Sequence, residues 1–154
     1  MSYCFDTNTL LDAGERYYPI DSFPTLWEKF EELIAANRLI APEVVLTELT
    51  AKSDWTAQWA KDHSGIFLPI TPDIQTQVTD ILTAHPTLVD PERHRSEADP
   101  FIIAMAAVKG FAVVTSERRR AGAVGRLKIP DVCDALQVRC VTLLDVFRTE
   151  GWTF

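Results

Sequence analysis

The sequence contains 154 residues, of which 47% are hydrophobic, and it carries a net charge of -7. This length suits one domain with one core. No apolar run is long enough to cross a membrane, and the amino terminus lacks the features of a signal peptide, so we expect a cytoplasmic protein. The acidic balance disfavours phosphate contacts over most of the molecule, because such contacts require Lys and Arg.

The first half of the chain predicts short strands that alternate with helices. In chain order we expect a strand at 3–5, a helix at 8–17, a helix at 23–34 capped by Asp21 or Ser22, a strand at 39–41, a helix at 43–50 opened by Pro42, a helix capped by Asp54, and a strand at 67–70. Pro69 places the last strand at an edge of the sheet, because proline cannot donate to a strand ladder.

The second half continues the alternation. We expect a helix from Pro72 that Pro86 closes, a polar loop at 85–98, a helix at 99–109 begun by Asp99 and Pro100, a strand at 111–115, a short helix at 129–136, a strand at 138–142 and a helical turn at 143–147. This order predicts a single α/β domain over residues 1–154. Its architecture should be a three-layer α/β/α arrangement around a mainly parallel sheet of about four to five strands.

Trp55 and Trp59 are four residues apart, on one face of their predicted helix. We expect both rings in the core. The alternative is that they anchor a homodimer or another partner, as aromatic residues often do at interfaces.

Four acidic residues occupy positions where a solvated carboxylate is not expected. Asp6 and Glu117 each follow an apolar strand, and Asp99 stands at the start of an apolar helix. Glu48 falls in a helical stripe that is otherwise apolar. An unpaired buried carboxylate is costly, so each must bind a partner, a proton or a cation. For Asp6 and Asp99, helix N-capping alone is the plainer alternative.

These acids meet at one edge if the first and fourth strands are neighbours in a parallel sheet. The carboxyl ends of such strands form the crevice in which open α/β sheets bind ligands. Several carboxylates in one crevice repel one another unless a divalent cation is present. Their hard oxygen atoms suit Mg²⁺ or Mn²⁺, and this combination favours phosphodiester hydrolysis.

Four segments, in this order, resemble the motifs of a PIN domain: FDTNTLL at 5–11, VLTEL at 45–49, ADPFIIA at 98–104 and VVTSE at 113–117. The resemblance extends from residue 3 to about residue 147. PIN domains are typically metal-dependent ribonucleases, and many are toxins of toxin–antitoxin pairs. The resemblance therefore implies single-stranded RNA as substrate, Mg²⁺ or Mn²⁺ as cofactor and an antitoxin protein as partner. The segments at 17–19 and 129–133 indicate a PIN-like subfamily other than the best-known toxins.

The resemblance also implies roles for single residues. Asp6, Asp99 and Glu117 would hold one or two metal ions, and Glu48 would position the attacking water. Small polar residues beside these acids would orient the carboxylates or the substrate; they are Thr7, Asn8, Thr115 and Ser116.

The fourth acid departs from the family pattern. The family usually has Asp where this chain has Glu117, so Asp131 or Asp134 is an alternative ligand. Glu97 is a further candidate for an outer ligand, although its polar surroundings favour a solvated side chain.

A cluster of cations follows the fourth acid directly. Five of the 15 basic residues fall within residues 118–128, which we call the basic arm, and no acid occurs at 118–130. Arg118, Arg119 and Arg120 are candidates to bind the phosphates of a single strand, with Gly122 and Gly125 leaving the arm mobile until substrate arrives. The arm could equally dock an acidic antitoxin tail or be a solvated face.

Two other functions fit parts of the sequence. A catalytically weak PIN-like module that binds RNA or protein is compatible with the unusual fourth acid. A haloacid-dehalogenase-like phosphatase also places an Asp after its first strand, but it normally needs a second Asp two positions later. Asn8 occupies that position here.

Overall fold

The computed structural model describes residues 1–90, 97–122 and 125–154. Five strands form one parallel sheet in the order β3-β2-β1-β4-β5. They are β1 (Tyr3–Phe5), β2 (Leu39–Pro42), β3 (Phe67–Leu68), β4 (Ala112–Val114) and β5 (Cys140–Val141). Cys4 pairs with Ile40 on one side and with Val113 on the other, so the predicted neighbourhood of the first and fourth strands is confirmed.

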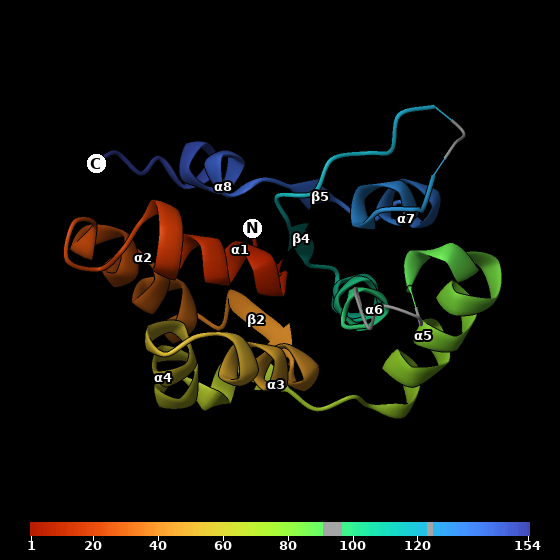
Figure 1. Cartoon of the computed structure of the whole chain (residues 1–154), viewed down its shortest axis with the longest axis horizontal. Helices are drawn as coiled ribbons and strands as arrows, with labels where there is room; N and C mark the ends of the chain where they lie inside the picture. Colours follow the sequence, from red (N-terminus) through yellow and green to blue (C-terminus); the bar gives the residue numbers. More distant parts are fainter. Residues whose placement is uncertain (91–96, 123–124) are drawn as a thin grey trace.

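Helices cover both faces of this sheet and complete three layers (Figure 1). α5, α6 and α7 lie on one side in this view, and α1, α2 and α8 lie on the other. The α-helices are α1 (Thr7–Asp12), α2 (Pro24–Ala35), α3 (Glu43–Lys52), α4 (Trp55–Asp62), α5 (Pro72–Ala84), α6 (Asp99–Lys109), α7 (Ile129–Leu136) and α8 (Leu143–Glu150). Shorter helical segments are η1 (Ala13–Tyr17), η2 (Ser64–Ile66) and η3 (Pro86–Leu88). The predicted α/β class and parallel sheet are confirmed.

The central strand β1 packs against both helical layers. All three of its residues are fully buried, as expected for a strand covered on both faces. The ring of Phe5 meets Phe30 of α2 edge to face, with centroids 5.6 Å apart. Cys4 lies against the other layer, where its thiol donates to the carbonyl of Ile102 in α6 at 3.6 Å. β1 therefore holds α2 and α6 in fixed positions on its two sides.

The two tryptophans of α4 pack inside their own chain. Trp27 of α2 lies 4.6 Å from Trp55 and 5.2 Å from Trp59, measured between ring centroids. Trp59 is buried and Trp55 is half-buried. The expectation that both rings serve the core is confirmed, and a homodimer stays a prediction.

The helix predicted at 8–17 changes its pitch halfway. Its second half, η1, is a π-helix that packs on α4. A Cβ atom at Gly14 would lie 2.4 Å from Thr56 Oγ1, so only glycine allows this approach. Glu15 then accepts hydrogen bonds from the amide and the hydroxyl of Thr56, at 3.2 and 3.0 Å.

The predicted start of α2 is wrong by one residue, and the predicted capping contacts of α2 and α4 are absent. α2 begins at Pro24 with Phe23 at its N-cap, and neither Asp21 nor Ser22 caps it. Asp54 precedes α4 but makes no capping hydrogen bond, because the Ser53 hydroxyl accepts from the amide of Ala57 instead.

Two other boundaries also differ from expectation. Pro42 is the last residue of β2 and also the N-cap of α3, one position before the first helical position expected for it, and α8 continues to Glu150, after which Gly151 adopts a left-handed conformation. Residues 91–96 of the predicted polar loop lie outside the described residues. Within the part of the chain that the structure describes, no helix is both long and apolar enough to cross a membrane.

Candidate active site

Asp6 lies directly after β1, at the carboxyl edge of the sheet. Its amide donates to the carbonyl of Val114 at 3.0 Å, so its backbone continues the pairing of β1 with β4. The residue is only 3% exposed. It occupies the N-cap position of α1, but its side chain makes no capping hydrogen bond. N-capping alone therefore does not explain this carboxylate.

A hydrogen-bonded chain links Asp6 to the segment after β4. The hydroxyl of Thr115 donates to Asp6 Oδ2 at 2.9 Å and accepts from the amide of Glu117 at 3.1 Å. The Oε2 atom of Glu117 in turn accepts from the amide of Ile129, the first residue of α7, at 3.0 Å. These contacts fix two of the predicted site acids: Thr115 holds the carboxylate of Asp6 and the backbone of Glu117, and the amide of Ile129 holds the carboxylate of Glu117.

The surroundings of Asp6 disfavour its charge. Burial raises its pKa from 3.8 to about 7, although the hydrogen bond from Thr115 opposes that change. The negative charges of Glu117 and Glu48 raise the pKa further, and the nearby amide of Asn8 lowers it. Both charged side chains that change the pKa of Asp6 are therefore acids. The edge carries negative charge that a bound cation or proton would relieve.

Asp99 and Glu48 reach the same edge from helices. α6 runs from the carboxyl edge back to the amino edge, because Gly110 ends it just before β4 begins. Asp99 opens this helix and is 6% exposed. Its predicted N-cap position is wrong by one residue, since Ala98 is the N-cap. Glu48 lies in α3 and is half-buried, and its effect on the pKa of Asp6 places its charge near that carboxylate.

The small polar residues at this edge differ in their exposure. Thr7 is buried, and its Oγ1 atom has no hydrogen-bond partner among the described residues. Asn8 and Ser116 are exposed, whereas Thr115 is buried and its hydroxyl donates to the carboxylate of Asp6. Thr115 is therefore the one whose orienting contact the structure displays.

The alternative fourth acids have other partners. Asp131 accepts from the backbone amides of Lys128 at 2.8 Å and Arg120 at 3.2 Å, which holds the start of α7. Asp134 is exposed and pairs with Arg119. Glu117 is the acid whose charge acts on Asp6, so the geometry favours it over these two. Glu97 is exposed.

The basic arm is partly fixed against the rest of the chain. Arg119 donates from Nε and Nη2 to the two carboxylate oxygens of Asp134, at 2.6 and 2.8 Å. Arg120 donates from Nη1 to the carbonyl of Gly125 at 3.2 Å, and Arg126 donates to the carbonyl of Leu88 at 2.6 Å. Arg118 is exposed and borders the acidic edge. The three arginines predicted to act together therefore have different environments.

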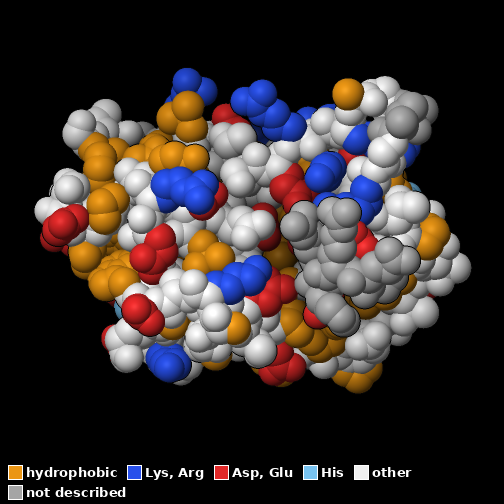
Figure 2. All heavy atoms as spheres, in the orientation of Figure 1, with side chains coloured by type: hydrophobic (Ala, Val, Ile, Leu, Met, Phe, Trp, Pro, Cys, Tyr) orange, Lys and Arg blue, Asp and Glu red, His pale blue; other side chains and the backbone are white. Residues whose placement is uncertain are grey.

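The acids at this edge fit a magnesium-type ion in donor chemistry. Within residues 1–90, 97–122 and 125–154, no three Asp, Glu, His or Cys side chains converge closely enough to enclose a metal ion. Mg²⁺ does not require such a cage, since it usually keeps several waters and binds one or two carboxylates together with substrate phosphates. The buried, repelled carboxylate of Asp6 and its neighbour Glu117 provide such a pair. Figure 2 shows Asp and Glu side chains near the centre of the face in view, with Lys and Arg around them.

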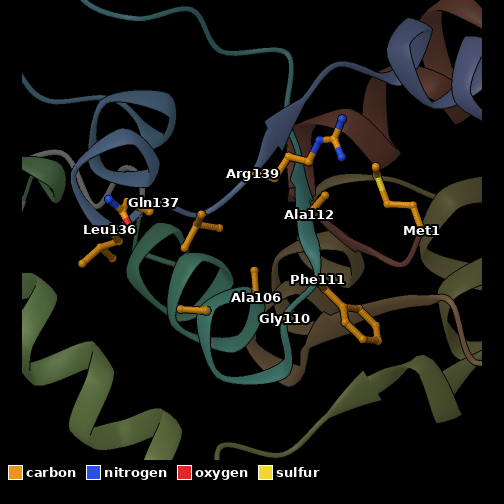
Figure 3. Close-up of a pocket in the computed structure, with 10 residues that line it drawn as sticks. Met1, Ala106, Gly110, Phe111, Ala112, Leu136, Gln137 and Arg139 are labelled. Atoms are coloured by element: carbon orange, nitrogen blue, oxygen red, sulfur yellow. The ribbon is translucent and has the colours of Figure 1, made fainter.

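Hollows lie at both edges of the sheet. One, of about 270 Å³, adjoins the acidic edge and is bordered by Glu117 and Arg118. Another, of about 350 Å³, lies at the amino edge, with Met1 and Arg139 on one side and Leu136 and Gln137 on the other (Figure 3). No acidic residue lines the amino-edge hollow. Only the first hollow is therefore beside the candidate site.

This topology and its carboxylate edge define a protein with a PIN-like fold. Two solved structures share that fold. The VapBC2 structure from Rickettsia felis, bound to a DNA fragment from the promoter, has a TM-score of 0.50 and 18% identity, over 76% of this chain and 88% of that chain. FitAcB from Neisseria gonorrhoeae has a TM-score of 0.52 and 15% identity, over 90% of this chain and 96% of that chain.

The sequence itself defines the particular family. The chain belongs to the family described as domain of unknown function DUF4411, whose model matches residues 3–154. Among curated proteins, none matches this sequence. The identities to the two solved structures are low, so they establish the shared fold and not a shared activity.

Proposed function

We propose that this protein is a metal-dependent endoribonuclease that hydrolyses phosphodiester bonds of single-stranded RNA. The observation that carries the proposal is the buried carboxylate of Asp6, whose neighbours at the carboxyl edge are the acids Glu117 and Glu48. A fold rarely gathers acids around a buried carboxylate without a use for their charge. The expected cofactor is Mg²⁺ or Mn²⁺.

The proposed reaction assigns a separate role to each of the acids. Asp6, Asp99 and Glu117 would hold the cation, which when bound supplies positive charge against the phosphate. Glu48 orients the attacking water. The water oxygen bonds to phosphorus and gives up a proton, while the bond from phosphorus to the 3′ oxygen breaks and that oxygen takes up a proton from solvent. The products carry a 5′-phosphate and a 3′-hydroxyl.

Thr115 would support this arrangement from behind. Its hydroxyl joins Asp6 to the backbone of Glu117, so both carboxylates keep their relative positions. Thr7, Asn8 and Ser116 are proposed to orient carboxylates or substrate, and Arg118 to bind a flanking phosphate.

A toxin–antitoxin pair is the proposed biological setting. It is supported by the fold shared with VapBC2 and FitAcB and by the PIN-like motifs. The partner would be an antitoxin protein. A gene for a small DNA-binding protein beside the gene for this chain would support that setting.

The test is cleavage of an end-labelled, mixed-sequence single-stranded RNA in Mg²⁺, in Mn²⁺ and in a chelator. We expect metal-dependent cutting that Asp6→Asn and Asp99→Asn each reduce at least about a hundredfold. Circular dichroism would show that both variants remain folded. Full activity in either folded variant removes that residue from the site.

Glu43→Gln provides the matched control. Glu43 opens α3 directly after β2, at the same edge, but its side chain is exposed. The substitution removes one negative charge as Asp6→Asn does, so it should leave the cleavage rate within about twofold. An equal loss in Glu43→Gln would mean that general surface charge, and not the buried acids, controls the rate.

A catalytically weak PIN-like module that binds RNA or protein is the second candidate. The observation that favours it is the separation of the acids, since no three of the described metal-binding side chains converge. RNA binding without cutting in either metal would support this candidate against the nuclease.

A further inference from the structure

A pocket of about 270 Å³ opens beside the candidate active site. We call it the side pocket. Three segments form it: the α1–η1 helix, the residues after β4, and the start of α8. These segments come together in the region between the labels α1 and β5 in Figure 1. In the α1–η1 helix the sequence predicted only Thr7 and Asn8 near the site, and it predicted no residue of α8 there.

The side pocket combines flat aromatic surface with charges of both signs. Tyr17 is 58% exposed and Leu144 is 50% exposed, although both are large apolar groups on the pocket wall. Asp12, whose Oδ1 atom lies 3.8 Å from Arg16, contributes an acceptor and Arg118 contributes a donor. The hydroxyl of Thr142, by contrast, is already hydrogen-bonded to Asp145 at the start of α8. An apolar lining with a few polar groups is the usual character of a small-ligand site.

The side pocket shares a wall with the catalytic acids. Glu117 lines it and also raises the pKa of Asp6 through its charge. Thr9 lines it and donates from its hydroxyl to the carbonyl of Val114 at 3.4 Å, which fixes α1 to the end of β4. A ligand in the side pocket would therefore contact Glu117, which is itself a neighbour of Asp6.

We propose that the side pocket binds one nucleobase of the RNA strand, next to the phosphodiester bond that is cut. The inference rests on the proposed nuclease function and adds a source of base preference to it. Every nucleobase has a flat face that stacks on an aromatic ring, here Tyr17, and an edge with hydrogen-bonding groups, here matched by Asp12 and Arg118.

The size of the pocket supports a base over a protein segment. Its volume of about 270 Å³ lies near the small end of ligand sites, which begin at about 300 Å³. One ring system fits such a space, whereas a helix of an antitoxin requires a long groove. The cation of Arg118 at the rim suits the phosphate that is attached to a bound nucleotide.

The experiment follows one base as it enters the pocket. An RNA octamer with a mapped cleavage site carries 2-aminopurine at each position in turn and is mixed with Asp6→Asn protein, which should bind without cutting. We expect the fluorescence to be quenched most strongly at one position next to the cleaved bond, because the base stacks on Tyr17 there.

Two variants test whether the side pocket is the site of quenching. Tyr17→Ala should abolish the position-specific quenching and weaken binding of the octamer at least about fivefold, and Tyr17→Phe should restore both. Leu144→Trp should fill the pocket and exclude the base without removing Tyr17. Phe154→Ala is the matched control, because Phe154 is 56% exposed and lies outside the pocket lining.

The possible failures are distinguishable. If the wild-type protein neither binds nor cuts RNA, the proposed function fails and this inference fails with it. If RNA is cut but no position is selectively quenched, or the quenching persists in both Tyr17→Ala and Leu144→Trp, only the side-pocket inference is overturned.

Discussion

Two acidic residues at opposite edges of the same sheet have pKa values that are shifted in opposite directions. Glu150, at the amino edge, accepts a hydrogen bond from the hydroxyl of Tyr3 at 2.6 Å and pairs with Arg38. Burial alone would raise its pKa, but these two partners lower the pKa below its usual value. Asp6, at the carboxyl edge, has a hydroxyl partner in Thr115 and acids as its charged neighbours, and its pKa is raised.

The difference separates a structural acid from a candidate functional one. Tyr3 begins β1 and Asp6 follows its last residue, so one three-residue strand connects the two environments. The fold supplies its own cation at the amino edge. At the carboxyl edge the charge is relieved by a proton or by a ligand from outside, which is what a catalytic site requires.

The largest expected effect on stability comes from replacing the ionisable carboxyl group of Asp6 by a neutral amide. The unfolded chain ionises this group near a pKa of about 3.9, and the folded chain near about 7. Its contribution to stability is therefore full below pH of about 4 and is lost as the pH rises through about 7. Asp6→Asn should stabilise the protein at pH 8 by as much as about 4 kcal/mol, at 1.36 kcal/mol per pKa unit, and have little effect at pH 4.

Urea unfolding at both pH values would measure this effect. Glu150→Gln is the comparison variant, because it should change the free energy of unfolding in the opposite direction. That substitution leaves Arg38 without its charged partner, so it should destabilise the protein at pH 8 by about 1 to 3 kcal/mol. If both substitutions destabilise at pH 8, the two edges are not electrostatically different.

A smaller effect is expected from the metal ion. Mg²⁺ or Mn²⁺ at about a hundred times its dissociation constant should stabilise the folded state by about 2.7 kcal/mol. For a domain of this size, the melting temperature should rise by about 5 to 10 °C. Differential scanning calorimetry would record the rise in the wild type and in Glu150→Gln, and its loss in Asp6→Asn. An equal rise in all three proteins would place the ion elsewhere.

Thr115→Val tests the link between the two carboxylates at the carboxyl edge. Removing the hydroxyl should reduce cleavage about 10-fold to 100-fold, because Asp6 and Glu117 lose their shared orientation. The pKa of Asp6 should also rise, which would shift the pH–rate profile towards higher pH.

Thr56→Val is the matched control for this variant. Thr56 is also a buried threonine whose hydroxyl donates to a carboxylate, that of Glu15, at 3.0 Å. Thr56 lies in α4, away from the acids of the carboxyl edge. The Thr56→Val protein should therefore be less stable than the wild type, but its pH–rate profile should not change. The same shift in both variants would contradict a specific role for Thr115.

The smallest effect should come from the exposed cations. Arg118→Gln is expected to reduce the salt dependence of RNA binding by roughly 0.7 in the log–log slope, the value for one phosphate contact with a single strand. Arg119→Gln should have less effect, because Asp134 already holds its guanidinium. Arg139→Gln, an exposed arginine at the amino edge, is the control, and fluorescence anisotropy at several salt concentrations measures all three. Equal slopes for Arg118→Gln and the wild type would exclude this phosphate contact.

The parallel sheet and its acidic edge could be predicted because their signals are local. The buried runs that precede Asp6 and Glu117, and the apolar stripe that contains Glu48, each lie within a few residues of chain. The placement of Asp6 directly after a strand followed from these runs, whereas the central position of that strand is known from the structure. The class of fold needed nothing further.

The details that the sequence could not supply depend on contacts between distant residues. Gly14 forms part of a π-helix because Thr56 lies against it, and no pattern near Gly14 reveals that neighbour. The bond from Thr115 to Asp6 joins residues 109 positions apart. The choice of Glu117 over Asp131 likewise depends on which of the two charges lies near Asp6, far away in the sequence. Contacts between residues so far apart cannot be inferred from the pattern of a single sequence.

The basic arm begins and ends at the same carboxylate. Glu117 precedes it, and the amide of Ile129, just beyond it, donates to Glu117 Oε2. The base of the arm is therefore closed independently of what lies farther out, with Arg119 and Arg120 held to α7 as well. Loop tips generally tolerate insertions when their bases are fixed. The length of the arm beyond Arg120 can therefore change without moving Glu117, whose carboxylate is held at the base of the arm.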